Sequence, residues 1–118
     1  MLKSPQEKTL ERMRDLKMEL GGIVEQLKNL GALKIVLFGS YVTGEVWSGS
    51  DLDILVVMPP SKTGKEWMSE IYSKVERNIA SDILAFTEKE LEKGVKISRF
   101  LRYVLRTGMV IYESKPKN

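Results

Sequence analysis

Apolar residues recur every three or four positions over the first thirty residues of the chain, a spacing that places them on one face of a helix. Ser4 reads as the N-cap of this helix, Pro5 as its first residue and Glu7 as the partner that closes a capping box. Gly31 suits the position just after a helix, and Gly21-Gly22 weakens the interior by about 1 kcal/mol per glycine relative to Ala. The pattern predicts one long helix with the apolar stripe Leu10, Met13, Leu16, Leu20, Ile23, Leu27 and Leu30.

Beyond this helix, short apolar runs alternate with helical patterns. The runs have the length and β-branched content of strands, and the predicted strands are Leu33 to Phe38, Asp51 to Met58, Ile79 to Phe86 and Met109 to Tyr112. Apolar spacing and a second capping box predict further helices over Lys65 to Arg77, from Thr87 to Gly94 and over Ser98 to Arg106. The order of elements indicates an α/β or α+β domain with a small sheet.

The chain has 118 residues, enough for one compact domain and too few for two. We expect a single domain made of an N-terminal helix (1–31), a core (32–112) and a polar tail (113–118). The longest apolar run, Ile54 to Met58, is far too short to span a bilayer. Because the N-terminus also lacks the apolar stretch of a signal peptide, we expect a cytoplasmic protein without membrane contact.

Two absences narrow the possible chemistry. The chain has no cysteine, which excludes disulfides, thiolate nucleophiles and cysteine-based zinc sites. It also has no histidine, the commonest general base and transition-metal ligand. Catalysis would therefore depend on carboxylates, hydroxyls, amines, backbone dipoles or a cation bound by oxygen. The net charge of +3 suits an anionic substrate or partner.

Asp51 and Asp53 are two residues apart on a predicted strand, so their side chains point to the same face with Cα atoms roughly 6.6 Å apart. Two carboxylates beside the apolar run that starts at Ile54 repel each other unless a positive charge lies between them. Ligands that are all oxygen favour Mg²⁺ or Mn²⁺. In the alternative interpretation, Asp51 caps the strand entry and Asp53 faces solvent.

Gly39-Ser40 stands at the end of the preceding predicted strand. A strand that ends in Gly-Ser and turns into a short helix offers free backbone N–H groups and a hydroxyl, which suits a phosphate. Gly39 lets the backbone approach the anion, and Ser40 can donate its hydroxyl. Gly-Ser is also an ordinary turn sequence, so the two motifs carry weight only together.

The combined pattern resembles the signature of the polymerase-β-like nucleotidyltransferases. Phe38-Gly39-Ser40-Tyr41-Val42-Thr43-Gly44 is followed by Ser50-Asp51-Leu52-Asp53, with ten residues between Ser40 and Asp51. The resemblance covers most of the chain and is closest to the minimal nucleotidyltransferases (MNT) of bacteria and archaea. It implies a small mixed sheet flanked by helices, and transfer of a nucleoside monophosphate from an NTP, first of all ATP, with Mg²⁺ or Mn²⁺ as cofactor.

The resemblance also implies a third carboxylate on a later strand, and Asp82 occupies the matching position. Asp51, Asp53 and Asp82 would then be the catalytic and metal-binding residues, and Gly39 and Ser40 would bind the nucleotide together with Asp51 and Asp53. Asp82 would complete the metal site and orient or deprotonate the attacking hydroxyl. The alternative is that Asp82 ends a strand and pairs with Arg77 or a lysine.

The sequence departs from the family in the turn after Gly-Ser, where relatives often carry arginine. Tyr41-Val42-Thr43 is neutral here, so another cation would have to help bind the triphosphate. The candidates are Lys34, Lys62, Lys65 and Arg77. Minimal nucleotidyltransferases are commonly paired with a helical HEPN protein and act as antitoxins that add AMP to it. The resemblance therefore implies a HEPN partner and a protein hydroxyl as acceptor. The alternatives are a binding module that neutralises its partner without chemistry, and an enzyme that modifies an antibiotic hydroxyl.

Several other residues have two interpretations. Arg99, Arg102 and Arg106 form one stripe of a predicted helix, which either contacts nucleic-acid phosphates or, as we favour, is a solvated face. Trp47 stacks on a nucleotide base or anchors the core. Packing positions are expected for Trp67 and for three methionines, Met13, Met18 and Met68.

Overall fold

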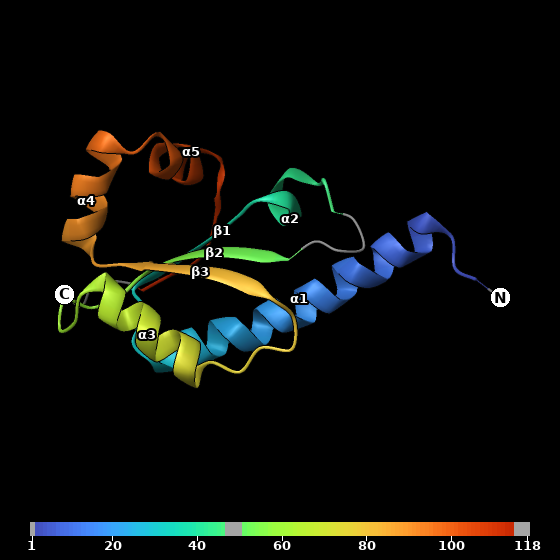
Figure 1. Cartoon of the computed structure of the whole chain (residues 1–118), viewed down its shortest axis with the longest axis horizontal. Helices are drawn as coiled ribbons and strands as arrows, with labels where there is room; N and C mark the ends of the chain where they lie inside the picture. The colour runs from blue at the N-terminus through green and yellow to red at the C-terminus, as the bar shows by residue number, and fades with distance from the viewer. Residues whose placement is uncertain (1, 47–50, 115–118) are drawn as a thin grey trace.

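The computed structural model describes residues 2–46 and 51–114 and has helices on both faces of one sheet (Figure 1). Trp47 and Ser50 lie outside the described residues. In chain order, the elements are α1 (Pro5–Asn29), β1 (Lys34–Phe38), α2 (Ser40–Thr43), β2 (Leu52–Val57), α3 (Gly64–Lys74), β3 (Ser81–Phe86), α4 (Glu88–Ile97), α5 (Arg99–Thr107) and β4 (Met109–Glu113). None of the helices in these residues is long and apolar enough to cross a membrane.

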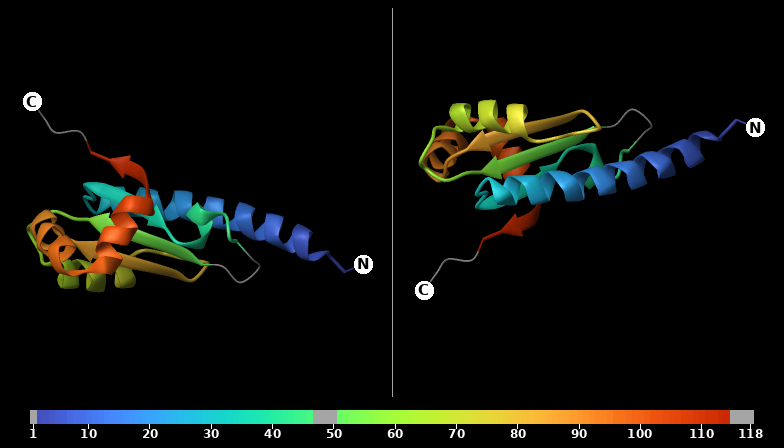
Figure 2. Two further views of the ribbon diagram at one scale, coloured as in Figure 1. Left: turned by 90° about the horizontal axis from the view of Figure 1, so that it is seen from above. Right: turned by 90° about the horizontal axis from the view of Figure 1, so that it is seen from below.

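The four strands form a mixed sheet in the order β3-β2-β1-β4. β1 pairs antiparallel with both β2 and β4, whereas β2 and β3 are parallel and are connected through α3. α1 and α3 cover one face of the sheet, and α4 and α5 lie over the other (Figures 1 and 2). This arrangement confirms the expected small mixed sheet flanked by helices.

Strand alternation gives the sheet two apolar faces, so the core has two parts. Against α1 and α3, side chains such as Ile35 and Ile54 pack on fully buried Ile23 and Ile71. Trp67 belongs to this part, as predicted, and its indole N–H donates to the Pro59 carbonyl at 2.8 Å. Against α4 and α5, the second part contains Val36, Phe38, Leu55, Val57, Leu101 and Val104.

The long N-terminal helix runs through both central glycines, as predicted. The Ser4 hydroxyl accepts the Glu7 amide N–H at 3.1 Å and so caps the first turn. The C-terminal part of the helix packs on the sheet, while its N-terminal part projects beyond it (Figure 2). The packing role predicted for Met18 is wrong, because the residue is 80% exposed on this helix, and Met13 is 40% exposed.

Two predicted helix ends differ from the structure, and near each end a side chain from another helix lies close to the backbone. α3 stops at Lys74 rather than Arg77, and the Gln26 side chain of α1 satisfies both backbone groups of Glu76, with distances of 2.7 and 3.0 Å. α4 continues past Gly94, where a Cβ would lie 2.6 Å from the Leu101 side chain. Gly94 therefore permits close packing of α4 on α5 instead of ending α4.

Candidate active site

Strand register brings the predicted site residues to one end of the sheet. In the parallel pair β2–β3, Asp53 stands opposite Asp82. In the antiparallel pair β1–β2, Asp53 also stands opposite Phe38, so Gly39 follows directly beside it. Asp51 precedes β2 at the same end, the right-hand end of the sheet in Figure 1.

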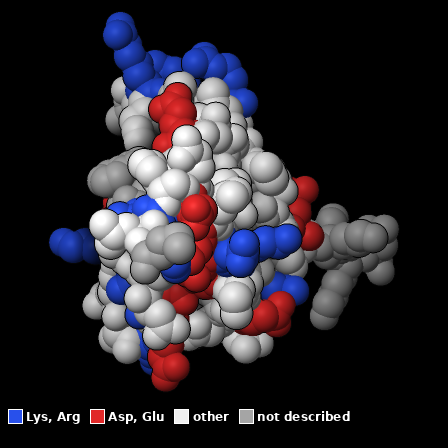
Figure 3. Space-filling view, turned by 90° about the vertical axis from the view of Figure 1, so that its right-hand side faces the viewer, with Lys and Arg blue, Asp and Glu red and all other residues white. Residues whose placement is uncertain are grey.

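Asp53 and Asp82 lie on the sheet face that α4 and α5 cover. Asp53 is in phase with Leu55, a residue of the second core part, and Asp82 is in phase with Leu84, which packs against it. The strand ends extend beyond this apolar packing, since Asp53 is only half-buried and Asp82 is exposed. Acidic side chains gather near the middle of this end of the molecule, with basic side chains beside them (Figure 3).

The electrostatics of Asp53 reflect this crowding of negative charge. Burial raises the pKa of the Asp53 carboxyl, and the charges of Asp82 and Asp51 raise it further. A cation would relieve this repulsion, and a set of carboxylate oxygens suits Mg²⁺ or Mn²⁺, so the residues present fit a divalent ion. In the described ranges, however, no three acidic side chains already form a cluster that could hold an ion.

Gly39 allows β1 to approach the Asp53 carboxylate closely. Its φ of 82° and ψ of −157° lie in a region that residues with a side chain rarely adopt. A Cβ at this position would lie 2.9 Å from Asp53 Cγ and would overlap Asp53 Oδ2. The backbone conformation therefore favours glycine here, and a side chain at this position would in addition displace the Asp53 carboxylate.

α2 begins directly after Gly39, as the short helical turn expected from the sequence. The N–H groups of Val42 and Thr43 both donate to the Gly39 carbonyl at 3.1 Å. No side chain caps the helix start, since Gly39 is the N-cap residue. The N–H groups of Ser40 and Tyr41 precede these donors, so they and the Ser40 hydroxyl are the groups that an anion would meet.

Arg12 is a site residue that sequence reasoning missed. Its guanidinium lies 3.3 Å from Asp51 Oδ1, and its side chain is 22% exposed. The contact joins α1 to a residue 39 positions later in the chain. No local pattern signals it, because Arg12 resembles any other polar position between the apolar residues of α1.

The three lysines considered as compensation for the neutral turn lie away from the candidate site. Lys34 pairs with Glu113 at 3.5 Å at the opposite end of β1. Lys62 contacts Glu70 at 2.6 Å and precedes α3 at that far end, and Lys65 lies in the first turn of α3. None of these three lysines lies at the Gly39 end of the sheet.

Arg77 lies near the candidate site but does not pair with Asp82. Its guanidinium donates to the Ser81 carbonyl at 3.0 Å and lies 4.3 Å from the centre of the Tyr72 ring. Within residues 2–46 and 51–114, no lysine or arginine forms an ion pair with Asp82. The alternative of a structural Asp82–Arg77 pair is therefore not observed.

Phe100 of α5 borders the site. Its ring meets Phe38 edge-on, with ring centres 5.9 Å apart, and Phe38 is the cross-strand neighbour of Asp53. Phe100 falls in the helix predicted over Ser98 to Arg106, and the residue is 50% exposed. Arg99, Arg102 and Arg106 are exposed on this helix, which fits both a solvated face and a stripe that contacts phosphates.

Comparison with known proteins agrees with this geometry. The model of the nucleotidyltransferase domain family matches residues 17–112, while no match is found among curated proteins. The fold resembles the crystal structure of a provisionally named nucleotidyltransferase from Sulfolobus solfataricus, with a TM-score of 0.54, 19% sequence identity, and coverage of 96% of this chain and 90% of that one. Because the family model spans most of the chain, including Gly39, Asp53 and Asp82, the chain belongs to the nucleotidyltransferase domain family and is a nucleotidyltransferase.

Proposed function

We propose that this chain transfers AMP from ATP to a hydroxyl group of a protein partner. The observation that supports this most is the strand register, which places Asp53 opposite Asp82 and directly beside Gly39. A carboxylate pair next to a glycine-lined turn brings cation-binding and phosphate-binding groups together, as nucleotidyl transfer requires.

Each site residue has a role in this proposal. Gly39 and Ser40 bind the β and γ phosphates, and Asp51, Asp53 and Asp82 would hold Mg²⁺ or Mn²⁺. A bound ion would neutralise charge on the phosphate oxygens. Asp82 accepts the proton of the acceptor hydroxyl, whose oxygen bonds to the α-phosphorus. The bond to the bridging oxygen breaks, and pyrophosphate leaves with the electron pair.

Two further residues complete the nucleotide site. Arg12 provides, from α1, the positive charge that the neutral turn lacks, because its guanidinium already lies at the Asp51 end of the sheet. Phe100 offers a half-exposed aromatic ring beside the Phe38–Asp53 pair, on which a nucleobase can stack. Together they would bind opposite ends of the nucleotide, the phosphates and the base.

The acceptor is proposed to come from a partner protein. The described residues form the catalytic sheet and its covering helices, with no additional domain to bind an acceptor. A HEPN-type helical protein fits this need, and the chain would act as the antitoxin of a HEPN/MNT pair. Nucleic acid is not favoured as a partner, since an exposed arginine stripe such as that of α5 is more often a solvated helix face.

A labelling experiment tests the proposal. The chain is incubated with Mg²⁺, ATP labelled at the α-phosphate, and the product of the neighbouring gene as candidate partner. Label should move to the partner with the wild type, and not with Asp53→Asn. Absence of transfer under these conditions would contradict the proposed reaction, and full activity of Asp82→Asn would contradict the role of the third carboxylate.

A second candidate function follows from the neutral turn Tyr41-Val42-Thr43. A site that holds triphosphate weakly favours a module that neutralises its partner by binding alone. Stable complex formation without label transfer, unchanged in Asp53→Asn, would support this alternative. An antibiotic hydroxyl as acceptor is tested in the same assay when an aminoglycoside replaces the protein.

A further inference from the structure

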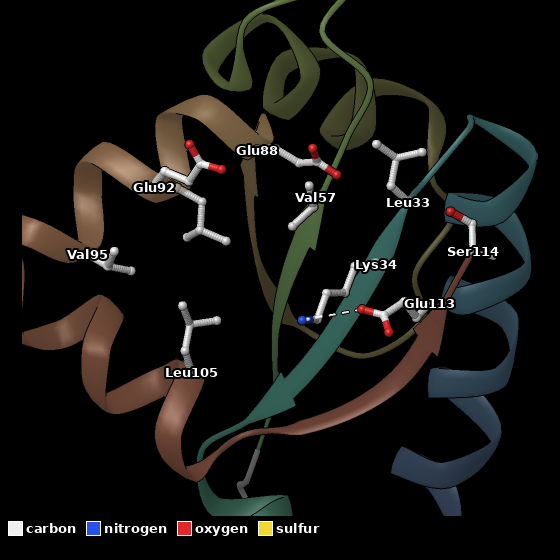
Figure 4. Close-up of a pocket in the computed structure, with 10 residues that line it drawn as sticks. Leu33, Lys34, Val57, Glu88, Glu92, Val95, Leu105, Glu113 and Ser114 are labelled. Atoms are coloured by element: carbon white, nitrogen blue, oxygen red, sulfur yellow. Dashed lines mark ion pairs between the residues drawn. The ribbon is translucent and has the colours of Figure 1, made fainter. Parts of the chain in front are cut away.

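One cavity among the described residues lies far from the aspartates. It has a volume of about 790 Å³ and opens where β1 begins and β2 ends, under α4 and α5 (Figure 4). β1 has five residues, which separates the cavity from the Gly39 end by roughly 15 Å. A ligand in this cavity would therefore leave the candidate active site open.

The walls of the cavity are apolar and its charged groups are mainly acidic. Leu33, Val57, Leu91, Val95 and Leu105 line it, and the charged lining residues are Lys34, Glu88, Glu92 and Glu113. Three carboxylates and one ammonium leave a net charge of −2. The Lys34 ammonium lies 3.5 Å from Glu113 Oε2, so this pair is satisfied within the chain.

Glu88 and Glu92 remain without an ion pair to any described residue. They are four residues apart on α4 and therefore lie side by side on one helix face, an arrangement that costs a helix a few tenths of a kcal/mol. Figure 4 shows both at the side of the cavity formed by α4. The helix N-terminus favours the charge of Glu88, which lies in the first turn of α4, but a cation on a ligand would still be attracted to both carboxylates.

The apolar surface is larger than the cavity itself. Leu105, which lines the cavity, is 38% exposed, and Val110 on the neighbouring edge strand is 50% exposed. Val110 stands opposite Val36, a residue of the core under α5, so it lies on the same sheet face as the cavity. A small amine would fill the cavity and leave this surface in water, whereas a polypeptide segment would cover both.

We propose that this groove binds a basic apolar segment of the partner protein. The segment would place leucine-sized side chains between Leu91 and Leu105, and a lysine or arginine against Glu88 and Glu92. This inference rests on the proposed function only in that the partner is the acceptor protein. Docking here leaves the aspartates open to an acceptor hydroxyl on another part of the partner.

The probe for this proposal is the purified product of the neighbouring gene, the candidate partner. Its Kd for the full chain is measured by calorimetry without nucleotide or metal, in an Asp53→Asn background so that no transfer contributes. The charge reversal Glu88→Lys/Glu92→Lys should weaken binding at least about tenfold. The matched control is Glu11→Lys/Glu25→Lys, which makes the same charge change on exposed positions of α1 and should leave Kd unchanged.

Two further variants separate the components of the contact. Glu88→Gln/Glu92→Gln should remove most of the salt dependence of Kd, because the cation then has no charged partner. Leu105→Ser should weaken binding equally at low and high salt, because it removes only apolar contact. Both substitutions are at surface positions, and circular dichroism verifies that the variants are folded.

The outcomes distinguish this inference from the proposed reaction. Equal Kd values for the groove variant and its control would overturn the docking site, as would the absence of any complex. Self-association of the chain that Glu88→Lys/Glu92→Lys abolishes would identify a second copy as the occupant and also overturn it. A complex that depends on the groove but transfers no label would support the docking site and contradict the reaction.

Discussion

Replacement of Gly39 by alanine tests whether close approach of β1 to Asp53 is needed for catalysis. The backbone at Gly39 has φ 82° and ψ −157°, a conformation that costs a residue with a side chain on the order of 1–3 kcal/mol. For a domain of this size, each kcal/mol lowers Tm by about 4 °C. The new methyl group would also overlap Asp53 Oδ2, so the carboxylate must move.

Gly44→Ala is the matched control, because Gly44 has nearly the same φ, 81°, with no atom within 4 Å of a Cβ. Its substitution costs about 1–2 kcal/mol of stability but leaves Asp53 in place. A misplacement of about 1 Å in a catalytic group can cost on the order of 10²-fold in rate. We therefore expect Gly39→Ala to lose about 10²-fold in kcat/KM, and Gly44→Ala to keep the wild-type value.

The measurement combines thermal unfolding with the rate of AMP transfer, determined well below the Tm of both variants so that each is folded. A Gly39→Ala protein with wild-type kcat/KM would refute the argument from the Asp53 contact. Equal losses in both variants would refute it too, since backbone strain alone would then explain the effect.

Three further predictions concern other contacts. Burial raises the pKa of Asp53 above 3.8, and the two neighbouring aspartates raise it further. The folded state therefore binds the Asp53 proton more tightly than the unfolded state does. As a result, the stability of the fold decreases as pH rises through the raised pKa. Metal-free Asp53→Asn should therefore have a higher Tm than the wild type at pH 7, and the gap should close below about pH 3.8; a lower Tm at pH 7 would contradict this sign. Tyr72→Phe should lower the free energy of unfolding, measured in urea, by about 1 kcal/mol, because the Ile83 amide N–H loses the Tyr72 hydroxyl that accepts its hydrogen bond at 2.8 Å. An unchanged urea midpoint would mean that water replaces the hydroxyl. Arg12→Gln should raise the KM for ATP more than Arg12→Lys does, because only Gln removes the charge beside Asp51, and equal KM values would argue against phosphate binding by Arg12.

The parts of the fold that depend on local chemistry were predictable from the sequence. Ser4 caps α1, and Thr87 forms a capping box with Glu90 at the start of α4, because these motifs act within one turn of helix. The strands before Gly39 and after Asp51 were expected within one residue of their observed bounds, since apolar runs between turns define them. That Gly39 and the aspartates belong to one site was expected from the family resemblance rather than from the residues alone.

The features that sequence reasoning missed depend on long-range contacts. The end of α3 lies where Gln26, about fifty residues away, binds the backbone of Glu76. Arg12 reaches Asp51 only because α1 lies along the sheet. The groove near Glu88 and Glu92 exists only once α4 and α5 cover the ends of β1 and β2. Patterns within ten or twenty residues contain no information on such contacts.

The parallel pairing of β2 and β3, which places Asp53 opposite Asp82, has a consequence for where the chain can accept an insertion. The two carboxylates meet at the start of their strands, whereas the connection from β2 to β3 leaves from the opposite end. Each doubling of that connection would cost only about 0.6 kcal/mol in closure entropy. A whole recognition module inserted at the exposed turn around Ser61 would therefore leave the reacting groups where they are. The catalytic geometry and the substrate range can be altered separately.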